Sequence, residues 1–423
     1  MNNLFRGTIL GFGLLLATAS EAGAAPGLRM MVDQEGDFAL VGNTLGQDCR
    51  RSVPLPVVGT VGSCGDSEEA LLDSAPDALW RADSPAAGDA EAGAGITREQ
   101  ARTAAMLVLP DGATITHALL YWGAQIEAGV GADTTVTLDR EGGFSEEVAA
   151  TDSWEVTINL GKPDEAHVYQ SFADVTDLVK QQGAGAYRVG GVDMVDVSEL
   201  DDTRTFAGWW MVVLYESPGM PRRNLAIYDG LERVSRSHDQ AFSLEGVRVP
   251  EGGLSAKLGI VGYEGDHNIG GDRIYINPSG ATPDPSEALG DRLNPPDNFF
   301  NGSRGWLGEP VSVEGDLPQL TGEEQSMPGV DMDVVDITSR VRSGDTAIRV
   351  LATADEIDGN AELYFIGGLV TSIAPGPGGY LAGSGMFGPC AAGGGVGGAS
   401  SGWLLGAALG GLIGLRRAGR RRR

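Results

Sequence analysis

One loop of this sequence gathers side-chain oxygen atoms that could bind a metal ion. Residues 263–272 read Tyr-Glu-Gly-Asp-His-Asn-Ile-Gly-Gly-Asp, and their oxygen donors are Glu264, Asp266, Asn268 and Asp272. A second acidic group further along the chain comprises Asp355, Asp358 and Asn360. Ca²⁺ takes about six to eight oxygen ligands of this kind, so structural calcium is the one cofactor that the pattern suggests. The spacing is not that of an EF-hand, and turns of an acidic protein carry the same residues without a metal. Both interpretations stay open.

Catalytic chemistry has weaker support in the sequence. Residues 398–402 read Gly-Ala-Ser-Ser-Gly, but a nucleophilic serine of that motif must lie between a strand and a helix, and this segment is a glycine-rich spacer. The four histidines are scattered along the chain: His117, His167, His238 and His267. We therefore expect no catalytic activity. A secreted hydrolase with paired carboxylates is the less favoured alternative, because a sequence cannot show the cleft that such a pair needs.

The N-terminus has the three parts of a secretory signal peptide. Arg6 precedes an apolar run over residues 9–19, and the small residues Ala22 and Ala24 follow it. A membrane-spanning helix needs about 20 apolar residues, so this shorter run favours export and cleavage. We predict that residues 1–24 are removed and that the rest of the chain is exported.

Export would place the two cysteines of the N-terminal arm in an oxidising compartment. Cys49 and Cys64 lie fifteen positions apart, and cysteines in an oxidising compartment are expected to pair. Closing this loop would stabilise the fold by about 3 kcal/mol. Zinc is disfavoured because neither a second cysteine pair nor clustered histidines lie nearby. We predict a Cys49–Cys64 disulfide.

The C-terminus combines a lone cysteine, a small-residue spacer, a short apolar segment and an arginine cluster. Cys390 precedes the spacer, residues 403–415 are apolar, and six arginines follow them. A helix of this length rises only about 20 Å, short of the roughly 30 Å hydrocarbon core. These features together resemble the MYXO-CTERM sorting tail of myxobacterial surface proteins. The resemblance implies processing near Cys390, a lipid on that cysteine and display on the outer cell surface. A simple C-terminal membrane anchor is the alternative.

The net charge excludes one class of partner. Without its two ends the chain keeps 23 basic and 57 acidic residues, a net charge near −34. Proteins that bind nucleic acid need a basic face, so we expect no nucleic-acid partner. A solvated, self-repelling surface explains the charge most simply. Binding of calcium or of a cationic partner is the functional explanation.

The chain is organised around an apolar segment at residues 209–215, which read Trp-Trp-Met-Val-Val-Leu-Tyr. Gly208 and Pro218 flank the segment, and its length is too short for a buried helix. Strand side chains alternate between two faces, and here both faces are apolar. The pattern therefore predicts a central strand rather than an edge strand.

Segments before this strand recur after it in the same order. The matched pairs are 109–112 with 249–252, 115–122 with 254–263, 134–138 with 273–277, 174–176 with 336–338, 186–189 with 347–350, and 209–215 with 363–370. The recurrence predicts an internal duplication of one β unit. Val136 and Leu138 of the first copy should then match Ile274 and Ile276 of the second copy, with all four side chains pointing inward.

Each copy contains an Asp-Val/Ile-Thr element, Asp174 to Thr176 in the first and Asp336 to Thr338 in the second. Its Asp or Thr side chain can cap a single helical turn. This motif, followed by a glycine and a strand, resembles galactose-binding-like jelly-roll sandwiches and the β modules of bacterial adhesin-like surface proteins. The resemblance covers about residues 104–374 and implies a fold more than a function. Arg340 replaces the Leu178 of the first copy, so the second turn should pack differently.

We predict an all-β protein with two tandem jelly-roll-like β-sandwiches related by internal duplication. The predicted segments are a signal peptide (1–24), an N-terminal arm without a large core of its own (25–103), the first sandwich (104–217), a connecting strand or linker (218–243), the second sandwich (244–374), a glycine-rich tether (375–402) and a short hydrophobic helix with the arginine tail (403–423). Within the second copy, residues 277–326 form a long insertion, and such loops are either binding segments or disordered.

These features predict an exported, membrane-anchored protein of the outer cell surface with an adhesive or structural role. The partners would be the membrane, through the tail or its lipid, and a surface glycan or protein ligand. A surface glycan-binding module is the alternative function, suggested by the sandwich resemblance and by Trp154 and Trp306.

Overall fold

The computed structural model describes residues 23–47, 79–84, 89–93, 96–127, 129–161, 164–195, 206–236, 238–265, 267, 269–316, 320–357 and 363–376. All of them belong to one compact unit, Met1–Ala382. The signal peptide, Cys49, Cys64, Cys390 and the arginine tail lie outside the described residues.

The described elements are almost all strands. One hydrogen-bonded path runs, in spatial order, through β18 (Glu309–Pro310), β17 (Arg304–Trp306), β19 (Val330–Asp336), β15 (Leu254–Tyr263), β21 (Leu363–Pro375), β13 (Arg222–Ser235), β1 (Ala24–Thr44), β12 (Ala207–Glu216), β6 (Thr114–Ile126), β10 (Asp164–Asp174) and β9 (Asp152–Gly161). A second sheet holds β2 (Gly46–Gln47), β3 (Leu79–Ser84), β5 (Arg102–Leu107), β11 (Gly185–Gly190), β7 (Thr135–Asp139) and β8 (Ser145–Ala149), with β4 (Asp89–Gly93) paired to β3. A third sheet holds β14 (Gln240–Glu245), β20 (Ala347–Ala354) and β16 (Asp272–Ile276). The short helices are α2 (Thr176–Gln182), η2 (Pro285–Glu287) and η3 (Thr338–Arg340).

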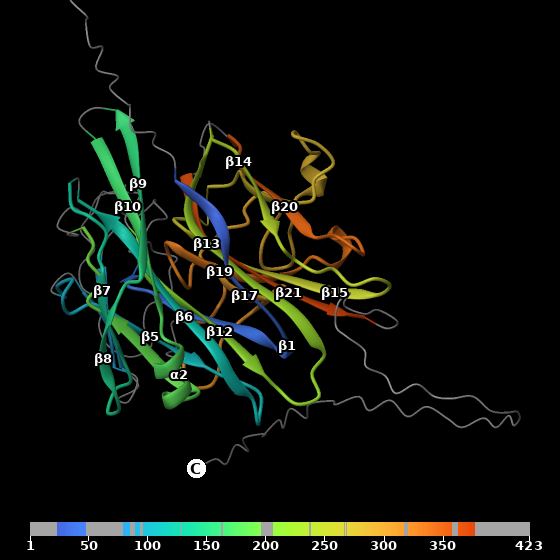
Figure 1. Cartoon of the computed structure of the whole chain (residues 1–423). Coiled ribbons are helices and arrows are strands. Elements are labelled where there is room, and N and C mark those ends of the chain that lie inside the picture. The colour runs from blue at the N-terminus through green and yellow to red at the C-terminus, as the bar shows by residue number, and fades with distance from the viewer. Residues whose placement is uncertain are drawn as a thin grey trace, which may run out of the picture. The chain divides into compact units, whose positions relative to one another are not determined.

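The long path folds back on itself at β1. Residues 24–35 of β1 pair with β13, and residues 36–44 pair with β12. In a flat sheet β12 and β15 would lie about 19 Å apart, four strand spacings. Trp210 of β12 nevertheless donates a hydrogen bond of 2.8 Å from Nε1 to the hydroxyl of Tyr263 in β15. The β12-β6-β10 layer therefore packs face to face against the β13-β21-β15 layer. Figure 1 labels the strands of both layers.

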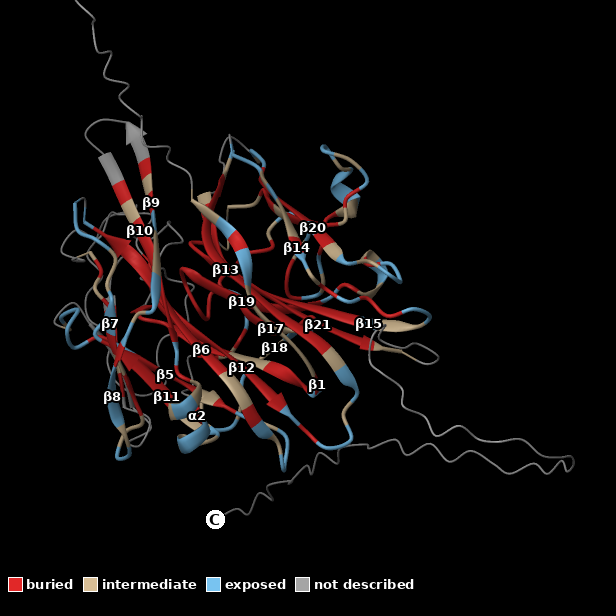
Figure 2. Cartoon of the chain, in the orientation of Figure 1, coloured by how far each residue is buried: buried red, intermediate tan, exposed pale blue. Residues whose placement is uncertain are grey.

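The strand around which the sequence is organised lies in the middle of this stack. Every residue of β12 from Ala207 to Tyr215 is buried, and β12 pairs with β1 on one side and β6 on the other. Trp209 donates from Nε1 to Thr103 of β5 at 3.0 Å, whereas Trp210 faces the second copy. The prediction of a central strand that is buried on both faces is confirmed, and Figure 2 shows the buried centre of both layers.

The pairing order confirms the internal duplication. In the first copy β1-β12-β6-β10 form one sheet and β5-β11-β7 the other; in the second copy β13-β21-β15-β19 and β14-β20-β16 repeat both orders. Val136, Leu138, Ile274 and Ile276 are all at most 2% exposed. Val189 pairs with Leu138, and the matched Val350 pairs with Ile276. The all-β sandwich prediction is therefore confirmed.

The first strand of each copy lies upstream of the boundary that the sequence predicts. The arm assigned to residues 25–103 contains β1, which is a central strand of the fold, and the connecting strand or linker assigned to 218–243 contains β13. Polar residues hid the central position of these strands from the pattern. Asp37 in β1 is only 3% exposed because Lys257 Nζ lies 2.5 Å and Arg223 Nε 3.4 Å from its carboxylate. The partners of Asp37 belong to the second copy, so a local pattern could not reveal that its strand is central.

The Asp-Val/Ile-Thr element makes the same hydrogen bonds in both copies. The carboxylates of Asp174 and Asp336 accept from the backbone N–H of Thr176 at 2.9 Å and of Thr338 at 2.7 Å. Each threonine hydroxyl then accepts an N–H from the neighbouring strand at 3.0 Å. The helical turn that follows is α2 in the first copy and only the single turn η3 in the second, which agrees with the different packing expected there.

The insertion at 277–326 is described apart from 317–319 and packs along the second copy. It contributes β17, which pairs in parallel with β19, and the hairpin partner β18. The first copy has β8 beside β7 at the corresponding point of the chain. The insertion therefore takes the place of a strand that would extend the third sheet beside β16. Its folded segment lies instead at the edge of the long path of strands, next to β19.

Candidate functional site

Two of the four predicted calcium ligands lie among the described residues, and both are buried. Glu264 is 5% exposed and has a positive φ of 62°. Asp272 is fully buried, and its Oδ2 accepts the backbone N–H of Phe300 at 2.5 Å, which ties the insertion to β16. Asp266 and Asn268 lie outside the described residues. This loop is therefore not a fully exposed hairpin tip.

Only one residue of the second acidic group, Asp355, lies among the described residues. Asp355 pairs with Arg273 of β16, whereas Asp358 and Asn360 lie outside the described residues. Within the described part of the chain, no group of three or more His, Cys, Asp or Glu side chains is arranged to hold a metal ion.

A broad polar depression of about 710 Å³ lies beside α2 in the first copy. Its lining includes His117 of β6, Lys180 of α2 and the exposed Glu146 and Glu147 of β8. Burial and the nearby ammonium of Lys180 lower the pKa of His117 and so favour its neutral imidazole. This depression is an open, charged surface. It could contact a polar ligand but does not enclose one.

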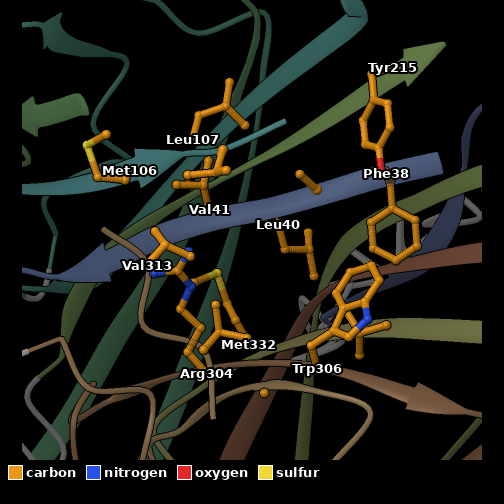
Figure 3. Close-up of a pocket in the computed structure, with 15 residues that line it drawn as sticks. Phe38, Leu40, Val41, Met106, Leu107, Tyr215, Arg304, Trp306, Val313 and Met332 are labelled. Carbon is orange, nitrogen blue, oxygen red and sulfur yellow. The ribbon is translucent and has the colours of Figure 1, made fainter. Parts of the chain in front are cut away.

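A more enclosed, apolar groove lies between the first copy and the insertion of the second copy. It has a volume of about 210 Å³. The residues drawn in Figure 3 come from β1, β5, β12, β17, β19 and the segment after β18, and those labelled are Phe38, Leu40, Val41, Met106, Leu107, Tyr215, Arg304, Trp306, Val313 and Met332. Val108 at its edge is 54% exposed. We refer to this feature as the interface groove.

Trp306 is held in place at one end of the interface groove. Lys257 Nζ lies 4.4 Å from the centre of the Trp306 ring, and the ring of Phe38 lies 5.8 Å away. Lys257 also pairs with Asp37. Burial lowers the pKa of Lys257, and the carboxylate of Asp37 opposes that shift. One face of the indole therefore carries a fixed cation.

A buried ion pair within the insertion lies at the other end of the groove, and its carboxylate also contacts the first copy. Arg304 is 4% exposed, and its Nη1 lies 3.1 Å from Asp316 Oδ2. The other oxygen of Asp316 accepts the backbone N–H of Met106 in β5 at 2.8 Å. Burial lowers the pKa of Arg304, while Asp316 opposes the shift. Asp316 thus connects Arg304 of the insertion with β5 of the first copy.

The dimensions of the interface groove limit what it can bind. Sites for small molecules usually measure about 300–1,000 Å³, so a groove of about 210 Å³ fits one or two apolar side chains. Of the two aromatic residues singled out in the sequence, Trp306 lines the groove, whereas Trp154 of β9 packs near Arg29. The sequence pattern missed Arg304, Asp316 and Met106, because only the fold brings them together.

None of the helices in the described part of the chain is long and apolar enough to cross a membrane. No protein-family model matches this chain, and no curated protein matches it in sequence.

Proposed function

We propose that this chain is a surface-anchored adhesive or structural protein without catalytic activity, whose two β-sandwich copies act as one rigid body. The observation that carries the proposal is the join between the copies. They share β1, and Trp210, Tyr263 and Gln170 form a fully buried hydrogen-bonded group between them. Domains of one chain normally move relative to each other unless their interface is large and apolar. A stiff body of this kind suits a protein that transmits force between a cell and its surroundings.

The sorting-tail resemblance supplies the place of action in this proposal. Processing near Cys390 and a lipid on its sulfur would hold the exported body at the outer membrane surface. Two acyl chains would make the attachment stable, whereas one would be marginal. The segment of thirteen apolar residues at 403–415 then needs to act only as a transient stop during export.

Replacement of Cys390 by alanine tests this proposal. We expect the Cys390→Ala chain to keep its arginine tail and to be missing from the outer surface, as measured by antibody labelling of intact cells and by mass mapping. Retention of these cells on a surface under flow should fall to that of cells lacking the chain. Normal display of Cys390→Ala would falsify the anchor, and unchanged retention of cells lacking the chain would exclude the adhesive role.

Ligand binding at the interface groove is the second candidate function. Its apolar lining and small volume favour the side chains of a protein partner as the ligand. A glycan is the alternative ligand, because the indole of Trp306 is only partly buried. We expect the exported chain to give no saturable signal on a glycan array. A saturable signal that Trp306→Ala abolishes and Trp154→Ala preserves would instead establish glycan binding at the groove.

A further inference from the structure

A fully buried carboxylate organises the loop at residues 300–303 of the insertion. Asp331 of β19 is 0% exposed, and its Oδ2 accepts three consecutive backbone N–H groups. The donors are Asn301 at 2.8 Å, Gly302 at 2.9 Å and Ser303 at 3.2 Å. Three such bonds to one oxygen favour the ionised form of a carboxyl group. Burial and the neighbouring carboxyl group of Asp333 outweigh these bonds and raise the pKa of Asp331, so its ionised form needs a counter-ion here.

A second buried carboxylate lies beside it. Asp333 is two positions further along β19 and so lies on the same face of the strand, and it is also 0% exposed. Its Oδ2 accepts from the hydroxyl of Ser303 at 3.3 Å. Its Oδ1 lies so close to Gly305 of β17 that a Cβ there would come within 2.0 Å of it. Burial raises the pKa of both carboxyl groups, which shows how poorly this site solvates two charges.

Four side-chain oxygen atoms of this network are buried and accept no hydrogen bond from an N–H or O–H group of the described residues, although the carboxyl groups of Asp331 and Asp333 lie close enough to share a proton. They are Oδ1 of Asp331, Oδ1 of Asp333, Oδ2 of Asp291 and Oδ1 of Asn301. Asn301 is 1% exposed and central to the network, because its backbone N–H bonds Asp331 and its Nδ2 donates to the carbonyl of Leu293 at 3.0 Å. These bonds leave the lone pairs of the Asn301 amide oxygen available to coordinate a cation. Asp291 lies near enough for its charge to act on Asp333.

Among the described residues, no cationic side chain forms an ion pair with Asp331 or Asp333, and the nearby Arg304 pairs with Asp316 instead. The charge of Arg292 acts on Asp291. An uncompensated charge in the interior costs several kcal/mol, so such a group normally gains a counter-ion or a proton. The unused oxygens and the missing counter-charge are two separate observations that point to a cation.

We propose that Asp331 and Asp333, with the amide oxygen of Asn301, bind one divalent cation of the calcium class. All three side chains offer hard oxygen atoms, which suit Ca²⁺, whereas zinc sites are rich in nitrogen and sulfur. Two central carboxylates suffice because Ca²⁺ also accepts amide oxygens, backbone carbonyls and water. The cation would fix the insertion against β19 and thereby the wall of the interface groove that β17 forms.

Metal binding to the full exported chain tests this site. Tb³⁺ is the first probe, because Trp306 adjoins Gly305, the residue that pairs with Asp333, and can sensitise Tb³⁺ luminescence. We expect one luminescent site per chain that Ca²⁺ displaces. The melting temperature should rise by about 5 °C or more from excess EDTA to about 1 mM Ca²⁺. Asp333→Asn should lose both responses, while Asp355→Asn, at an exposed carboxylate of the same charge, should keep them.

Two results would overturn the site. Equal melting temperatures in EDTA and Ca²⁺ for the wild-type chain would mean that the two carboxyl groups share a proton instead of binding a metal. A Ca²⁺ response that survives in Asp333→Asn but disappears in Asp355→Asn would show that calcium binds at the acidic group that contains Asp355. If Asp333→Asn fails to fold, Asn301→Ala takes its place, because it removes the amide oxygen and keeps both carboxyl groups. An unchanged Ca²⁺ response in folded Asn301→Ala would then overturn the site.

Discussion

Replacement of Trp210 by alanine should lower the free energy of unfolding by about 3–5 kcal/mol, the usual cost of removing a buried tryptophan. Trp210 is fully buried between the copies and stacks on Tyr121 with 3.8 Å between ring centres. Its Nε1 donates to the Tyr263 hydroxyl at 2.8 Å and lies 3.3 Å from Gln170 Oε1. Alanine would remove the ring and this donor together and leave buried polar atoms unpaired. Urea unfolding monitored by circular dichroism measures the loss.

Trp306→Ala provides the matched control for this substitution. Trp306 is only partly buried at the interface groove, so its removal should cost clearly less than that of Trp210. If the free energy of unfolding falls equally in both variants, the interface between the copies stabilises the fold no more than the interface groove does. The proposal of one rigid body would then lose its main support.

Replacement of Gly36 by alanine should destabilise the chain by about 3 kcal/mol or more, at the upper end for added atoms in a packed interior. Gly36 is the first residue of β1 that pairs with β12, immediately after the segment paired with β13. A Cβ at this position would lie 1.8 Å from the carbonyl oxygen of Tyr215, and that backbone cannot move without breaking the β1–β12 pairing. Calorimetry should show the single transition of the wild type splitting, because β1 would no longer couple the copies.

Gly27→Ala is the control within the same strand. Nothing lies within 4 Å of a Cβ placed at Gly27, so this variant should stay within about 0.5 kcal/mol of the wild type. Comparable losses in Gly27→Ala and Gly36→Ala would show that glycine content, and not the crossing of β1 between layers, limits stability.

Local patterns in the sequence determine the strands and their repetition. An apolar segment between breakers defines β12, and alternation at Val136 and Leu138 defines β7 and its counterpart β16. Asp174 and Thr176 act on backbone groups close to them in space through bonds that recur in the second copy. Such features depend on burial, alternation and short-range hydrogen bonding, which a single sequence records directly.

Tertiary structure alone decides where buried charges find partners and how the layers stack. Asp37 is separated by 220 residues from Lys257, so nothing near Asp37 indicates that its strand is central. Asp331 and Asp333 alternate within an apolar strand, a pattern that hints at two inward acids but not at Asn301 or Asp291 beside them. Backbone pairing at β1 folds one path of strands into two facing layers and creates the interface groove. These outcomes depend on contacts between residues hundreds of positions apart, and only the folded chain brings those residues together.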